Sequence, residues 1–285
     1  MSNLKPTNDF LFKKIFGDAK NKDLLKDLLE AILPDLNISK VEINRDVSLD
    51  RQVITDKLGI LDVLATLNDD TRVNVEMQVK DYLNTIERSI FYGAHIYSEA
   101  LQMGQDYSET PRSISIWITS YNVFDNGPYH EIARLKRDFQ NTLLTDDLEF
   151  HYIQLPKFRK EKRDLSNKLE QWLLFIEYTN MEAIHMVDNK YVKKAEKELE
   201  YLTGDDKIRR LAYLREKGLR DEMAAMAKAR REGLAEGEAK GEAKGKAEGI
   251  ATNKKEIAKK MLAEKIDIET IIKITGLTKE EIIKL

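Results

Sequence analysis

Two segments in the first third of the chain carry the hydrophobic pattern of β-strands. In residues 72–80 every second side chain is apolar: Val73, Val75, Met77 and Val79. Residues 59–67 form an apolar run that is interrupted by Asp62, and a turn-like Asn-Asp-Asp separates the two segments. Because strand side chains alternate between faces, two adjacent antiparallel strands would bring Asp62 and Glu76 together on one face. Asn74, Gln78 and Lys80 share that face.

Helical spacing of apolar residues alternates with further strand patterns along the chain. We predict helices over residues 8–33 and 82–103. Strands are predicted at residues 40–49, 114–119 and 148–155. The first helix begins at a cap, Thr7 or Asn8, and Pro34 follows its end. The resulting order of helix, three strands, helix and strand, with one extra strand, indicates an α/β core.

The predicted helix 82–103 has two distinct faces. Its expected core positions are Leu83, Ile86, Ile90, Ala94, Tyr97 and Leu101. The opposite face carries Arg88, Tyr92, His95 and Glu99. Arg88 and Tyr92 are four residues apart, so their side chains can meet.

The C-terminal half of the chain has a helical pattern, with an amphipathic face over residues 165–231 that contains Trp172. Glycine then recurs every fourth residue from Gly233 to Gly249. We favour a helix over a flexible charged linker for this repeat, and we expect its small residues to let it pack closely against another helix. Residues 253–285 form a small apolar unit in which Gly276 ends one helix and Thr278 begins a capping box. A dimerisation cap is favoured there over a helix-turn-helix DNA reader.

These patterns divide the chain into four parts. Residues 1–160 form the core, and residues 161–231 form a helical extension packed on it. Residues 232–250 are the glycine–alanine repeat, and residues 251–285 are the small helical unit. We expect a homodimer that forms through the C-terminal helical region.

Composition narrows the possible functions. The chain has no cysteine, which excludes disulfides, thiolate metal sites and cysteine nucleophiles. It has no apolar run long enough for a membrane span and no apolar signal segment at its start, so a cytoplasmic protein is expected. The net charge of −3 argues against a globally basic nucleic-acid-binding surface. A local basic cluster at 157–163 is either a phosphate-contacting patch or a solvated linker.

Asp62 is the strongest candidate for chemistry, because a carboxylate inside an apolar strand is costly unless something pairs with it. A divalent metal ion held between Asp62 and Glu76 would pair with both. Mg²⁺ is the expected ion, because it prefers oxygen ligands and commonly takes only one or two of them from the protein. Asp9 is interpreted as a favourable charge at a helix N-terminus rather than as a third ligand.

The segment from Asp62 to Glu76-Met77-Gln78 resembles the active-site pattern of PD-(D/E)XK nucleases, with Gln78 where lysine is usual. Residues 5–17 and 87–97 are similar to one branch of this superfamily, the Rpn family of recombination-promoting nucleases, often labelled PD-(D/E)XK family transposases. The resemblance covers roughly residues 4–230.

The resemblance implies a restriction-endonuclease-like α/β core, with a mixed sheet flanked by helices and with helical C-terminal extensions. It further implies a Mg²⁺-dependent DNA endonuclease linked to recombination, mobile elements or phage defence. The expected catalytic residues are Asp62, Glu76, Gln78 and Lys80, with Asp62 and Glu76 on the metal and Lys80 replacing the missing charge. The expected DNA contacts are Arg88, Tyr92, Lys157, Arg159 and Lys160. The alternative is a nuclease-fold scaffold that binds DNA or a partner and does not cleave.

Overall fold

The structure is a computed structural model that describes residues 4–44, 62–68, 70–101, 103–177 and 181–285. It separates into two compact units, Met1–Leu219 and Arg220–Leu285, and each is described by itself. The predicted strand positions 45–49 and 59–61 lie outside the described residues.

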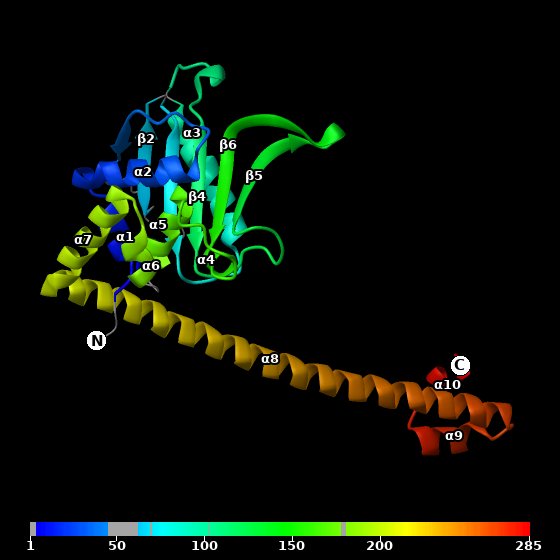
Figure 1. The fold of residues 1–285 in the computed structure, drawn as a ribbon. Helices are drawn as coiled ribbons and strands as arrows, with labels where there is room; N and C mark the ends of the chain where they lie inside the picture. Colours follow the sequence, from blue (N-terminus) through cyan, green and yellow to red (C-terminus); the bar gives the residue numbers. More distant parts are fainter. Residues whose placement is uncertain (1–3, 45–61, 69, 102, 178–180) are drawn as a thin grey trace. The chain divides into compact units, whose positions relative to one another are not determined.

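A six-stranded mixed sheet forms the centre of the first unit (Figure 1). The strands are β1 (Val41–Ile43), β2 (Val63–Leu67), β3 (Arg72–Gln78), β4 (Ser113–Thr119), β5 (His130–Arg137) and β6 (Thr142–Gln154). Their order is β1-β2-β3-β4-β6-β5; β3, β4 and β6 run parallel, and the other neighbours pair antiparallel. The expected α/β fold with a mixed sheet is confirmed, but β5 is an additional strand that the sequence analysis missed.

Helices cover both faces of this sheet (Figure 1). The α-helices of the first unit are α1 (Asp9–Phe16), α2 (Lys22–Ile32), α3 (Thr85–Ala100), α4 (Leu155–Phe158), α5 (Lys168–Glu177), α6 (Met181–Met186) and α7 (Lys190–Gly204). Short 3₁₀ turns occur at Ala19–Asn21, Tyr107–Glu109 and Phe139–Asn141. Side chains of α1, α2, α5 and α7 share one large core with β2, β3 and β4. Helix α3 packs on the opposite face against Trp117, Phe150 and Tyr152.

The first predicted helix, 8–33, is divided in the structure. Asn8 caps α1 as expected, since its side chain accepts a hydrogen bond from the Leu11 backbone N–H. Helix α1 then ends at Gly17, and the Asp18 side chain caps the short 3₁₀ turn before α2. Apolar spacing continues across this break because both helices bury leucine and phenylalanine in the same core. The prediction of one continuous helix was therefore wrong.

The predicted buried face of α3 was also wrong. Leu83, Ile86 and Ile90 are exposed, whereas Ser89, Tyr92, Gly93 and Ile96 face the sheet. A Cβ on Gly93 would lie 2.6 Å from the Phe150 ring, and Ser89 hydrogen-bonds to the Tyr152 hydroxyl. Small residues let α3 approach bulky aromatic side chains on the sheet, so its core face is not its most hydrophobic face.

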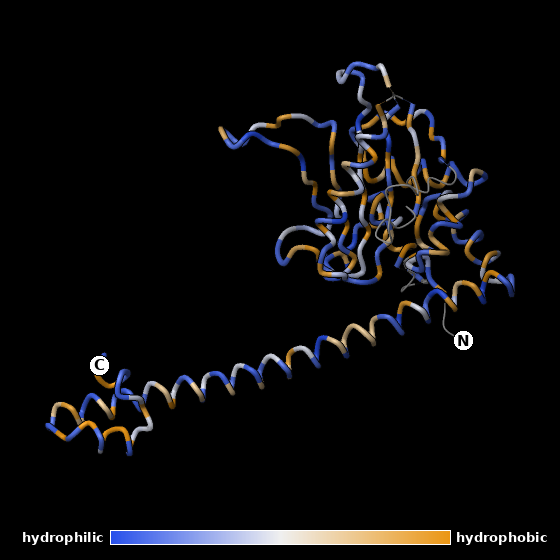
Figure 2. The backbone as a smooth tube through the Cα atoms, turned by 180° about the vertical axis from the view of Figure 1, so that it is seen from behind, coloured by the Kyte–Doolittle hydropathy of each residue, from blue (hydrophilic) through white to orange (hydrophobic). Residues whose placement is uncertain are grey.

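Helix α8 (Asp206–Ala263) carries the glycine repeat, which is helical as favoured from sequence. Space is open around a Cβ placed on each repeat glycine, so the described chain supplies no helix packed against this stripe. Figure 2 shows mainly hydrophilic and intermediate residues along the repeat. Ion pairs four residues apart, such as Glu236–Lys240 and Glu242–Lys246, support the helix instead.

The end of α8 packs with α9 (Ile268–Thr275) and α10 (Lys279–Ile283) around Ala258, Ile271, Leu277 and Ile282. Gly276 ends α9 with φ of 68°, and the Thr278–Glu281 capping box starts α10, both as predicted. Within the described chain, no helix combines the length and apolarity that crossing a membrane would require.

Candidate active site

Asp62 and Glu76 lie side by side where β2 begins next to β3. The Glu76 carboxylate accepts a hydrogen bond from the Asp62 backbone N–H at 3.2 Å, and the Asp62 carboxylate accepts one from the Met77 N–H at 2.8 Å. The two carboxylates therefore link the start of β2 to the end of β3, because Glu76 binds the Asp62 backbone and Asp62 binds the backbone of Met77, the residue after Glu76. Glu76 is paired in register with Trp117 of β4, which places it on the α3 face of the sheet.

Neutral groups surround the Glu76 carboxylate, which is only 3% exposed. The side-chain amides of Asn74 and Gln78 donate to its two oxygens at 3.2 and 3.3 Å. The carbonyl oxygen of Gln78 in turn accepts a hydrogen bond from Arg88 at 3.4 Å. Gln78 thus connects the carboxylate to a cation that comes from another element, α3.

Within the described residues, neither Asp62 nor Glu76 forms an ion pair. Burial raises the pKa of Glu76 to about 7, against the opposing effect of the hydrogen bonds from Asp62 and Asn74. Burial, followed by the nearby Glu76 charge, raises the pKa of Asp62 well above its ordinary value. Lys13 lowers the pKa of Asp62 and Arg88 lowers that of Glu76, but both pKa values stay raised, so the described residues neutralise the two carboxylates only in part.

A cavity of about 570 Å³ opens onto this pair. Asp9 of α1 also lines it, and its carboxylate is held by Arg215 of α8 at 2.6 and 2.8 Å. Asp9 does lie in the first turn of α1, as interpreted from sequence, but it faces the cavity as well. No sequence signal could pair Asp9 with a residue 206 positions away.

Aromatic rings contact two of the cations that line this cavity, Arg88 and Lys80. The Arg88 guanidinium lies 5.0 Å from the Tyr82 ring centroid, 5.7 Å from Tyr92 and 5.6 Å from Trp117. Lys80 lies beyond the end of β3, is 3% exposed, and places its ammonium 4.4 Å from the Tyr82 ring centroid. Such contacts stabilise a desolvated cation. Sequence reasoning placed Asn74 on the same strand face as Glu76 without assigning it a role, and it did not single out Tyr82.

The basic segment 157–163 is not brought to this cavity. Lys157 is buried and donates to Asn126 and Glu131, and Arg159 pairs with the buried Glu177. Lys160 is exposed. The pairs formed by Lys157 and Arg159 are internal, so these two side chains connect α4 to the start of β5 and to the end of α5.

The donors around Asp62 and Glu76 are carboxylate and amide oxygens, which suit a hard divalent cation such as Mg²⁺. Among the described residues, no group of three or more side chains drawn from histidine, cysteine, aspartate and glutamate is arranged so that it could hold a metal ion. Mg²⁺ commonly binds through one or two carboxylates, with water and substrate phosphate as its other ligands. The residues present therefore fit that ion.

Two family models match the chain. Residues 6–229 match the PD-(D/E)XK nuclease family transposases. Residues 252–285 match the C-terminal helix-turn-helix domain of the Rpn/YhgA-like nuclease family. Neither the curated proteins nor the solved structures include one that matches the chain. The second match supports the helix-turn-helix alternative for the C-terminal unit, whereas nothing in the matches or the structure supports dimerisation.

Proposed function

Since the chain belongs to the PD-(D/E)XK nuclease family transposases, we propose that it is a divalent-metal-dependent DNA endonuclease whose active site is centred on Asp62 and Glu76. The observation that carries this proposal is the pair itself. The Glu76 carboxylate is held by the Asp62 N–H and the Asp62 carboxylate by the Met77 N–H; both line one cavity and form no ion pair among the described residues. A cation between them would offset their mutual repulsion and their burial.

Asp62 and Glu76 would hold Mg²⁺, with Gln78 beside them. When bound, the ion would supply a more acidic water molecule and would neutralise charge on the scissile phosphate. The hydrogen bonds from the Asp62 and Met77 backbones keep the carboxylate oxygens in place before substrate arrives, which favours catalysis because little reorganisation is then required.

Arg88 is the cation that replaces the usual lysine in this proposal. Gln78 cannot carry a positive charge, but its carbonyl oxygen holds Arg88, and the rings of Tyr82, Tyr92 and Trp117 restrain the guanidinium. The guanidinium would bind a phosphate oxygen and stabilise the charge that develops during hydrolysis. Lys80, held over Tyr82, would add positive charge at the same cavity.

The C-terminal unit would contribute a second DNA contact. A helix-turn-helix domain suggests DNA binding, and α9, a turn containing Gly276, and α10 supply that motif here. DNA bound by this unit would raise the local concentration of substrate for the nuclease unit. A DNA endonuclease of this family would act in recombination, in the movement of mobile elements or in phage defence. Formation of a homodimer remains a prediction.

The test is nicking of supercoiled plasmid by the purified full-length protein, with Mg²⁺ or Mn²⁺ and with EDTA. We expect metal-dependent nicking that falls at least about 1000-fold in Asp62→Ala, because the substitution removes a metal ligand and its charge. Glu42→Gln changes an exposed strand carboxylate and is the matched control, with activity unchanged.

Undiminished nicking by Asp62→Ala would refute this site. If no version cleaves with any divalent metal while the wild-type protein still binds DNA, the alternative of a binding scaffold holds. The replacement of lysine by Gln78 is the feature that favours that alternative.

A further inference from the structure

Arg215 lines the cavity that opens onto Asp62 and Glu76, although it comes from α8, far along the chain. Its side chain is 57% exposed. The proposed mechanism uses Arg88 and Lys80 and leaves Arg215 without a role. Arg215 belongs to the first unit, Met1–Leu219, as do the other residues that line the cavity, so contacts within that unit set its position.

Contacts with α1 hold the beginning of α8 at this cavity. The side-chain amide of Asn8 donates to the carbonyl oxygen of Ala212 at 3.1 Å, and Ala212 is fully buried in the core of the first unit. Three residues further along α8, Arg215 Nε and Nη2 reach the Asp9 carboxylate at 2.8 and 2.6 Å. Residues three apart share one face of a helix, so Ala212 and Arg215 both face α1.

Asp9 engages only one edge of the Arg215 guanidinium. A guanidinium carries five N–H donors, and the bonds to Asp9 come from Nε and Nη2 alone. Arg215 Nη1 has no hydrogen-bond partner among the described residues. The carboxylate therefore fixes the direction of the planar group and leaves another edge for a second oxyanion. A phosphate matches that edge, because two of its oxygens can accept parallel N–H bonds.

The fold gains little from this ion pair. Arg215 is mostly exposed, and ion pairs near the surface contribute little to stability. The junction between α1 and α8 already has the Asn8 hydrogen bond and the buried Ala212, and Ile208 packs against the same core. The more specific consequence of the pair is a cation that Asp9 directs at the cavity.

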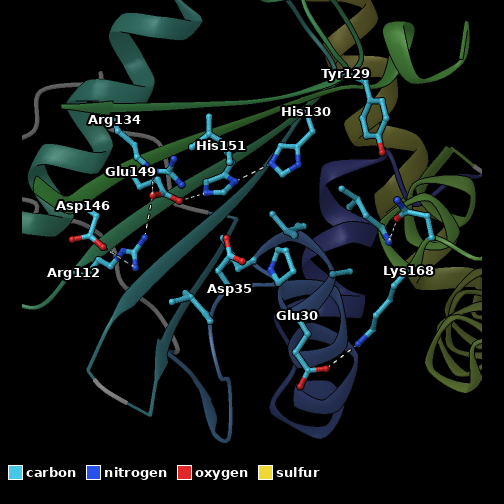
Figure 3. Close-up of a pocket in the computed structure, with 18 of the residues that line it drawn as sticks. Glu30, Asp35, Arg112, Tyr129, His130, Arg134, Asp146, Glu149, His151 and Lys168 are labelled. Carbon is cyan, nitrogen blue, oxygen red and sulfur yellow. Dashed lines mark hydrogen bonds and ion pairs between the residues drawn. The ribbon is translucent and has the colours of Figure 1, made fainter. Parts of the chain in front are cut away.

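The arginines of a second cavity show the structural role for comparison. This cavity has a volume of about 970 Å³, and Arg112 and Arg134 line it (Figure 3). Both donate to one oxygen of Glu149, at 3.0 and 2.5 Å, and His151 lies 2.6 Å from the other oxygen. His130 extends the network, with 2.9 Å between the two histidine ring nitrogens. Glu149 is 2% exposed, so these arginines neutralise a carboxylate inside the fold.

Positive charge exceeds negative charge around the active-site cavity. Among the described residues that line it, the cations are Lys13, Lys80, Arg88 and Arg215, and the carboxylates are Asp9, Asp62 and Glu76. Two arginines flank the carboxylate pair from different helices. Arg88 of α3 bonds to Gln78 beside Glu76. The pKa of Arg215 is raised first by its hydrogen bond to Asp9 and also by the charge of Asp62, which places Arg215 on the Asp62 side.

We propose that Arg215 binds a backbone phosphate of the DNA substrate that flanks the scissile phosphate, and that Asp9 is the positioning residue that orients its guanidinium. The Nη1 group donates to that phosphate while Arg88 binds the scissile one. This inference rests on the proposed function, because it takes DNA as the ligand of the cavity. A phosphate contact of this kind positions the strand and does not read its sequence.

The first experiment measures DNA binding without cleavage. The full-length protein is titrated against a fluorescein-labelled duplex in EDTA, at KCl concentrations from about 50 to 200 mM. Arg215→Gln removes one phosphate contact, so the slope of log affinity against log salt should fall by about 0.9, and binding should weaken about fivefold near 150 mM. Arg209→Gln changes another exposed arginine of α8, which pairs with Asp206, and this control should match the wild-type protein.

Asp9→Asn separates a phosphate contact from a purely structural ion pair. The substitution breaks the pair but keeps the charge of Arg215 and removes a negative one, so DNA should bind at least as tightly as to the wild-type protein. Arg215→Lys should recover part of the affinity that Arg215→Gln loses. If Asp9→Asn weakens binding as much as Arg215→Gln does, the pair only docks α8 on α1 and the proposal is overturned. An unchanged affinity and salt slope in Arg215→Gln would overturn it as well.

Plasmid nicking with Mg²⁺ distinguishes failure of this inference from failure of the proposed function. Arg215→Gln should raise KM about fivefold and lower kcat much less, because a contact with a flanking phosphate is the same in the bound substrate and in the transition state. If the wild-type protein nicks DNA and Arg215→Gln has an unchanged KM, the inference fails and the proposed function stands. If no version nicks DNA but Arg215→Gln still loses affinity in EDTA, the nuclease function fails and the phosphate contact stands.

Discussion

Two buried glutamates in one sheet have opposite electrostatic environments. Glu76 on β3 and Glu149 on β6 are 3% and 2% exposed, and both strands flank β4. Glu149 is bonded to two arginines and a histidine, and its pKa is lowered to about 2. Glu76 is bonded to amides and a backbone N–H, and its pKa is raised to about 7.

The comparison shows how a structural carboxylate differs from one prepared for a ligand. A buried charge is tolerated when fixed partners neutralise it, as they do at Glu149. At Glu76 the fold supplies geometry without full neutralisation, and it places a second carboxylate next to the first. In our proposal, the incomplete neutralisation of Asp62 and Glu76 by the described residues is the property that suits the pair to a cation, whereas acidity or burial alone would not distinguish it.

Among these variants, we expect Glu149→Gln to have the largest effect on the free energy of unfolding. The substitution leaves Arg112 and Arg134 without their shared carboxylate, so we predict a loss of about 3 kcal/mol of unfolding free energy at pH 7. Thermal or urea unfolding measures it. If Glu149→Gln is as stable as the wild-type protein, the conclusion that Arg112, Arg134 and His151 neutralise Glu149 is wrong.

The pH dependence of this loss sharpens the comparison. The pKa of Glu149 is about 2 in the folded protein, below its unfolded value of about 4.5. Its contribution to stability is therefore present above pH 4.5 and is lost as the pH falls towards 2. The difference between the wild-type protein and Glu149→Gln should shrink across that interval.

Arg88→Gln tests the cation that faces Glu76. We predict about a 100-fold loss of plasmid nicking, because the variant keeps a hydrogen-bonding group but removes the charge held beside Gln78. Arg88→Lys should recover part of the activity. Arg209→Gln removes an exposed arginine that pairs with Asp206 and is the control; equal activity in the Arg88→Gln and control proteins would exclude a role for Arg88.

In the absence of metal, we expect Glu76→Gln to increase the free energy of unfolding, by less than Glu149→Gln decreases it. The folded pKa of Glu76, about 7, lies above its unfolded value, so stability is lost as the pH rises from about 4.5 through 7. An amide avoids that loss. We predict a gain of about 1–2 kcal/mol at pH 8 that disappears at pH 4. A loss of stability at pH 8 would contradict the absence of a balancing charge.

Strands β2 and β3 could be predicted from sequence, because apolar and polar residues alternate along β3 and an apolar run marks β2. Val73, Val75 and Met77 are buried on one face, and Glu76 lies on the other, as their spacing predicts. Strand β5 could not be found this way. Its residues beyond His130 and Glu131 are exposed, and its pairing with β6 has register shifts near Leu135.

Other parts of the two sites depend on contacts between distant segments. The orientation of α3 follows from Gly93 against Phe150, not from the hydrophobicity of α3 itself. Glu149 and His151 sit inside a segment whose sequence predicts only a strand, and Arg112, Arg134 and His130 meet them through sheet pairing. Partners of this kind appear only when the sheet order is known.

The central claim is that Asp62 and Glu76 together accommodate a divalent cation, and calorimetric melting with increasing MgCl₂ tests it most directly. Melts at matched ionic strength compare the wild-type protein, Asp62→Asn and Glu149→Gln. At ten times its dissociation constant Mg²⁺ should add about 1.4 kcal/mol to the stability of the wild-type protein and of Glu149→Gln. It should add nothing to Asp62→Asn. Equal Mg²⁺-dependent shifts in all three proteins, or no shift in the wild-type protein, would contradict the claim.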